Sequence, residues 1–186
     1  LRAGDLDRAE AMLRRAVAAA PDRADAHALL GLTLVQKGDS AAGEAQLKTA
    51  HDADPLQPEA LFGLGFLAHQ RRDYAKAEPY LRQALDRKPG YTQARVVLAL
   101  SLSDQGRCEE AIPLFTRALE IDYSNLTLHA GLVRCLELAG RTAEATRAIC
   151  ERIASEGVPH VVISERFDSG DVNFIDGDSK AESQRS

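Results

Sequence analysis

The sequence predicts an all-α protein built as an α-solenoid, in which antiparallel helix pairs stack side by side. Three observations favour this class: small and apolar residues recur at a spacing of 34, alanine and leucine dominate the apolar set, and only 5% of residues are aromatic. Alanine and leucine favour helices, whereas a sandwich or barrel would need more valine, isoleucine, threonine and tyrosine. A period of this length is typical of a repeat protein whose units bury their faces against each other.

Four columns of residues carry the period. Leucine recurs at Leu30, Leu64, Leu98 and Leu132. The next place along the chain is mostly small: Gly31, Gly65, Ala99 and Val133. A second small column holds Gly43, Ala77, Ala111 and Ala145, and a large apolar column holds Leu13, Leu47, Leu81, Phe115 and Ile149. Only glycine or alanine fits where two helix backbones approach closely, so the columns predict tight contacts within each pair.

The helices are expected as one single helix followed by four pairs. The single helix is predicted at about 6–19, and the pairs at 24–37 with 40–53, 58–71 with 74–87, 92–105 with 108–121, and 126–139 with 142–156. Glycines mark three turns within pairs, and prolines stop three repeats. The predicted array therefore covers residues 1–157, as a half repeat (4–23) and four repeats (24–57, 58–91, 92–125 and 126–157). Residues 158–186 are expected to be a C-terminal tail or linker, partly extended or disordered.

These columns resemble the tetratricopeptide repeat consensus over residues 4–157. The resemblance implies a right-handed superhelix of about four and a half repeats, with the first helix of each pair (helix A) on the concave face and the second (helix B) outside. It also implies a scaffold that binds another protein or a peptide. The chain departs from the consensus at its fourth place, where tryptophan is common and His27 and His129 occur instead. We expect both histidines to pack against neighbouring helices.

Composition and charge exclude several kinds of partner. The net charge is -5, and basic residues do not gather in any run, so we expect no nucleic-acid partner. No apolar stretch is long enough for membrane insertion. Cys108, Cys135 and Cys150 give neither a disulfide framework nor zinc spacing, which favours a cytoplasmic location. A periplasmic location stays open, because a chain that begins at Leu1 is expected to have lost its N-terminal part.

The sequence offers no catalytic constellation. The five histidines form no His-x-x-x-His pairing, and neither a phosphate loop nor a Gly-x-Ser-x-Gly elbow occurs. We therefore expect no enzyme activity, no metal and no cofactor. One alternative is that the array belongs to a larger enzyme with its catalytic domain outside this chain, because residues 167–170 resemble the opening strand of the β domain that precedes some zinc carboxypeptidases. Another is a self-assembling scaffold, because open repeat ends expose their interfaces.

The resemblance also implies which A-helix residues face the groove. The predicted partner-binding set is Leu29, Leu32, Phe62, Phe66, His69, Val96, Val97, Leu100 and Arg134. Phe62 and Phe66 are four residues apart and therefore share one helical face. Family members that grip acidic C-termini carry Lys, Asn and Arg at places that here hold Ala28, Leu32, Gly63, Gln93 and Val97, so that carboxylate clamp is not expected.

The groove is thus predicted to be apolar in the middle and charged at its rim. We expect an apolar or amphipathic partner segment, bound as a helix in a groove. The residues leave two further possibilities open. One is that the phenylalanines only pack between adjacent A helices. The other is that the chain's own tail (158–186) docks in the groove.

Overall fold

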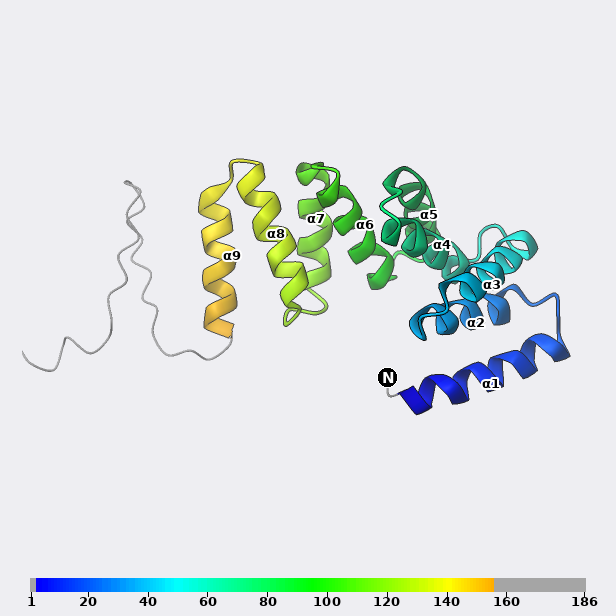
Figure 1. Ribbon diagram of the computed structural model, residues 1–186. Helices are drawn as coiled ribbons and strands as arrows, with labels where there is room; N and C mark the ends of the chain where they lie inside the picture. Colours follow the sequence, from blue (N-terminus) through cyan, green and yellow to red (C-terminus); the bar gives the residue numbers. More distant parts are fainter. Residues whose placement is uncertain (1–2, 156–186) are drawn as a thin grey trace, which may run out of the picture.

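The computed structural model describes residues 3–155, and within them every regular element is a helix (Figure 1). The elements are α1 (Ala3–Ala19), α2 (Ala24–Gln36), α3 (Ser40–Ala53), α4 (Pro58–Gln70), α5 (Tyr74–Arg87), α6 (Thr92–Asp104), α7 (Cys108–Leu119), α8 (Leu126–Leu138) and α9 (Thr142–Ser155). The all-α prediction is confirmed. The helix ends lie within three residues of the predicted ones, and the largest difference is the earlier start of α1. The predicted tail, 158–186, and the segment 167–170 lie outside the described residues.

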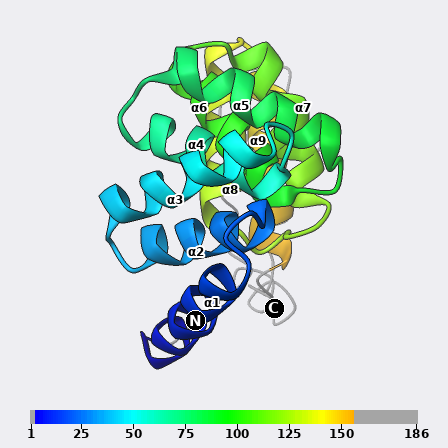
Figure 2. The ribbon, with the colours of Figure 1, turned by 90° about the vertical axis from the view of Figure 1, so that its right-hand side faces the viewer.

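The helices form a curved stack with α1 at one end and α9 at the other (Figures 1 and 2). Each A helix (α2, α4, α6 and α8) packs on its own B helix, on the preceding B-type helix (α1 in the case of α2) and on the neighbouring A helices. Among the described residues no two B helices (α3, α5, α7 and α9) make comparable contacts with each other. The A helices therefore lie closer together and form the inner, concave side of the stack.

The small-residue columns sit where paired helices touch. A Cβ atom added at Gly43 would lie 2.8 Å from the backbone oxygen of Gly31, and one added at Gly31 would lie 2.9 Å from the oxygen of Gly43. Ala77 and Ala111 occupy the same place in later repeats and are both 0% exposed. Small residues therefore recur every 34 positions because the backbones of α2 and α3 touch there, and the later helix pairs touch at the equivalent places.

Polar side chains at the fourth place of the repeat tie α2, α6 and α8 to the turn before each helix, whereas α4 has Leu61 at this place. The Nε2 atom of His27 lies 2.9 Å from the carbonyl oxygen of Pro21, and that of His129 lies 2.7 Å from the carbonyl oxygen of Tyr123. Arg95 donates in the same way to the carbonyl of Pro89. Both histidines are buried, which confirms that they pack against their neighbours.

The turns within pairs need a left-handed residue. Gly38, Gly106 and Gly140 have φ of 94°, 76° and 73°, and the equivalent residue of the second pair is Arg72, with φ of 60°. A side chain in this conformation costs about 1 kcal/mol, which glycine does not incur.

Replacing Arg72 with glycine is therefore expected to raise the free energy of unfolding by about 0.5–1 kcal/mol. Urea unfolding followed by circular dichroism measures the change. Arg87→Gly is the matched control, because Arg87 is exposed in α5 and has no positive φ. That control should lose about 1 kcal/mol. A loss of stability in both variants would show that the turn is not strained.

Candidate functional site

The concave face carries a hollow of about 610 Å³ between the four A helices. Its lining comes from α2, α4, α6 and α8 and from the turns before α6 and α8. The lining residues are Leu32, Val35, Gln36, Phe62, Phe66, Tyr91, Thr92, Gln93, Val96, Val97, Asp122, Asn125 and Leu128. The surface is thus mainly apolar, with carboxamide side chains around it.

Aromatic rings form one wall of the hollow. The ring centroids of Phe62 and Phe66 are 6.0 Å apart, and those of Phe62 and Tyr91 are 5.0 Å apart. Lys88 places its Nζ atom 4.7 Å from the Tyr91 ring centroid and 2.9 Å from Glu59. Burial, together with the nearby Glu59 carboxylate, raises the pKa of the Tyr91 hydroxyl. Tyr91 is therefore neutral at physiological pH. Its ring packs against that of Phe62.

His69 lies on the same helix as the phenylalanines but is held by its own polar partners. Its Nδ1 atom is 2.9 Å from the Ser101 hydroxyl, which donates to the carbonyl of Val97 at 2.8 Å. Its ring also lies 5.7 Å from the ring of Tyr74. Burial lowers the pKa of His69, which favours the neutral imidazole. This histidine connects α4 to α6.

Arg134 is held in a second polar cluster, between α6 and α8. Its Nη2 atom donates to the hydroxyl of Ser103 at 2.7 Å and to Asp104 at 2.9 Å. The Tyr74 hydroxyl donates to the other oxygen of Asp104 at 3.2 Å, and the Cys135 thiol lies 3.2 Å from the Ser103 hydroxyl. The guanidinium therefore links α8 to α6 of the preceding repeat, and its hydrogen bonds do not require a bound partner.

The structure brings together five of the nine residues predicted to bind a partner. Those five, all on the lining of the hollow, are Leu32, Phe62, Phe66, Val96 and Val97. Val97 is only 7% exposed, so it supports the surface more than it forms it. The other four lie outside the lining: Leu29, which is 45% exposed on α2, Leu100, which is partly buried, and the hydrogen-bonded His69 and Arg134.

Reasoning from A-helix positions alone missed part of the lining. Tyr91, Asp122 and Asn125 come from the turns that precede α6 and α8, and Thr92 and Leu128 from the first turns of these helices. A helical wheel shows which way a residue points only within a helix, so it could not place the residues of the turns. The repeat spacing contained a signal, because Tyr91 and Asn125 are 34 residues apart.

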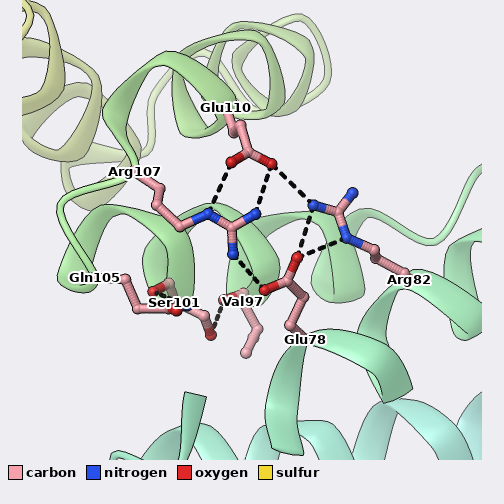
Figure 3. A network of polar contacts seen from close by, with 7 residues as sticks. All are labelled: Glu78, Arg82, Val97, Ser101, Gln105, Arg107 and Glu110. Carbon is pink, nitrogen blue, oxygen red and sulfur yellow. Dashed lines mark hydrogen bonds and ion pairs between the residues drawn. The ribbon is translucent and has the colours of Figure 1, made fainter. Parts of the chain in front are cut away.

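The outer side of the stack carries ion pairs that join successive repeats. Figure 3 shows Arg107 between Glu78 of α5 and Glu110 of α7, with Arg82 paired to the same two carboxylates. Glu44, 34 residues before Glu78, pairs with Arg71 and Lys48.

Hydrogen bonds from Arg71 and Lys48 lower the pKa of Glu44 to about 2. Glu44 therefore stays ionised, and its contribution to stability is lost only as the pH falls from its ordinary pKa toward that value. The Glu44–Arg71 and Glu78–Arg107 pairs connect successive repeats, whereas the Glu44–Lys48 pair lies within α3.

The described residues contain no group of three or more histidine, cysteine or acidic side chains arranged to hold a metal ion. None of the helices described is both long and apolar enough to cross a membrane.

Comparison with known proteins places the chain among repeat proteins. A family model for the tetratricopeptide repeat matches residues 1–42, 29–92 and 96–159. The structure of MamA from AMB-1 superposes with a TM-score of 0.66 at 25% identity, over 82% of this chain and 89% of MamA. A second crystal structure of MamA gives 0.69 at 21% identity, over 83% and 90%.

PilF of Pseudomonas aeruginosa gives a TM-score of 0.68 at 18% identity, over 81% of this chain and 69% of PilF, and so shows the shared fold. No curated protein sequence matches the chain. The family match spans most of the chain and agrees with the helix pairs and the small-residue contacts. The chain therefore belongs to the tetratricopeptide repeat family, and its fold is that of a protein-binding scaffold.

Proposed function

We propose that this scaffold holds an apolar or amphipathic segment of a partner protein in the concave hollow, and that it binds without catalysing a reaction. The observation that carries the proposal is the apolar lining itself. Phe62 and Phe66 are only partly buried, so their rings still offer surface to a partner. Aromatic side chains that a partner covers completely supply much of the affinity of protein interfaces.

The shape of the hollow suits an inserted helix. Its lining comes from four successive A helices, so a segment lying across them meets side chains from successive repeats. Apolar residues at helical spacing on the partner would enter the hollow between Phe62, Phe66 and Val96. The carboxamides of Gln36 and Gln93 would meet the polar side of the segment.

Affinity capture with paired variants tests this proposal. Phe62→Ala/Phe66→Ala removes the aromatic wall, and Gln93→Arg obstructs the hollow from an exposed position that does not depend on core packing. We expect both to lose the same captured proteins, with affinity falling by about 30-fold or more, because truncation of a central aromatic costs about 2 kcal/mol or more. Mass spectrometry and binding isotherms measure the loss.

The matched control is Gln83→Arg, an equal change at an exposed residue of α5, outside the lining. It should retain every partner. Circular dichroism melts of all three variants separate lost binding from lost folding. Capture that survives Gln93→Arg, or a double phenylalanine variant that binds fully yet melts early, would mean that these residues only pack the array.

Of the two alternative roles, a role inside a larger enzyme is compatible with the proposed function, whereas self-assembly has a distinct signature. An array that positions a partner for a catalytic domain elsewhere in a longer protein would still capture its partners through the hollow. Self-association predicts a mass in light scattering that rises with concentration. A cytoplasmic location is proposed because the described cysteines, Cys108, Cys135 and Cys150, are free thiols.

A further inference from the structure

The two edges of the array differ in charge. The turns that lead from a B helix to the next A helix, each taken with the last two residues of the B helix before it, carry six exposed acids: Asp22, Asp52, Asp54, Asp86, Glu120 and Asp122. The same turns carry the cations Arg23, Arg87 and Lys88, of which Arg23 is paired with Asp25 and Lys88 with Glu59. The opposite edge, at the turns within pairs, carries mixed charges: Lys37, Arg71, Arg72, Lys76, Arg107 and Arg141 against Asp39, Asp73, Glu109, Glu110 and Glu144. We call the edge at the turns from a B helix to the next A helix the acidic edge.

The hollow runs toward the acidic edge. On α2 its lining comes from the C-terminal half of the helix, at Leu32 and Val35, whereas on α8 it comes from the start, at Leu128. It therefore crosses the concave face diagonally and ends at the turn between α7 and α8. Asp122 of that turn is the one charged side chain among the described residues that line the hollow. It is exposed and accepts hydrogen bonds from Ser124 and Asn125.

We propose that the partner segment is cationic as well as apolar; this rests on the proposed function. Its apolar side chains enter the hollow, and its lysine or arginine side chains lie over the acidic edge near Asp122, Asp86 and Asp54. Opposite charges at the rim speed encounter and fix the orientation of a bound segment, whereas like charges exclude a competitor. The chain's own residues 165–186 carry six acids and three bases. Charge repulsion at this edge therefore disfavours them as the occupant.

Two model peptides test the charge of the partner. Both are amphipathic helices of about five turns with a leucine face; one has a lysine face and the other a glutamate face. Fluorescence anisotropy with the intact chain gives the dissociation constant of each peptide at low and high salt. We expect the leucine–lysine peptide to bind about tenfold more tightly at low salt, and the difference to shrink as salt screens the charges.

Charge variants locate the effect. Asp54→Asn/Asp86→Asn/Asp122→Asn neutralises three acids of the acidic edge while keeping one acceptor oxygen on each side chain. Its matched control, Asp5→Asn/Glu137→Gln/Glu151→Gln, makes the same change in net charge at exposed residues away from this edge. The edge variant should lose about tenfold in affinity for the leucine–lysine peptide, and the control variant should lose little.

Three results would overturn the inference while leaving the proposed function intact. They are equal or tighter binding of the leucine–glutamate peptide, an equal loss in the control variant, or tighter binding of a synthetic peptide of residues 156–186 than of the leucine–lysine peptide. In each of these cases Phe62→Ala/Phe66→Ala would still weaken binding. If that variant weakens binding of none of the peptides while its melt matches the wild type, the proposed function itself fails.

Discussion

Replacing Phe115 with alanine is expected to lower the free energy of unfolding by about 3–5 kcal/mol. Phe115 is 0% exposed and is the largest fully buried side chain of the described core. Its ring lies against the backbone of α8, since a Cβ atom added at Gly131 would fall 2.6 Å from the ring. Truncation therefore leaves a cavity between α7 and α8 that neither helix can fill without leaving its neighbours.

Urea unfolding followed by circular dichroism measures this loss. The matched control is Ile121→Ala, a large-to-small change nearby at a residue that is 62% exposed. Surface truncations of this kind change stability by about 0.5 kcal/mol or less. If Phe115→Ala were as mild as the control, the contact between α7 and α8 would not depend on this ring.

Gly43→Ala is expected to destabilise the protein by about 1–3 kcal/mol, although alanine is the better helix former. The new methyl group would lie 2.5 Å from the side chain of Val35 and 2.8 Å from the backbone oxygen of Gly31. The side chain can turn away, but the backbone of α2 can yield only if the helix pair separates. Overpacking therefore outweighs the gain in propensity.

The control for this prediction is Gly90→Ala. An added Cβ atom at Gly90 meets nothing within 4 Å, and the residue has no positive φ. This variant should keep its stability or gain up to about 1 kcal/mol, since alanine restricts the unfolded chain. A gain of stability in both variants, in thermal and urea unfolding, would contradict the close contact between the backbones of α2 and α3.

Helix pairing was predictable because it rests on local sterics that repeat. Gly43 and Ala77 each face the backbone of a paired helix, and Ala111, at the same place, is fully buried, so a spacing of 34 reveals the requirement for a small residue without any structure. Helix ends followed from turn glycines such as Gly38. Arg72 shows the limit, because its left-handed conformation is imposed by the array and leaves no glycine in the sequence.

The site was only partly predictable, for two physical reasons. Curvature decides whether a residue on the inner side of an A helix is open or covered: Phe66 lines the hollow, whereas Val97 is almost buried beneath it. Side chains also choose partners across repeats. His69 and Arg134 were predicted to face a partner, yet both are tied to serines of α6. Spacing along the chain does not encode either effect.

The most direct test of a partner in the hollow is photo-crosslinking in cells, with a light-activated amino acid placed at Gln93 in the hollow or at Gln83 on α5. Both positions are exposed, but only the first lines the hollow. A partner seated on the concave face should form a covalent adduct at position 93 and none at position 83. An adduct that forms only at position 83, or equally at both, would contradict a partner bound in the hollow.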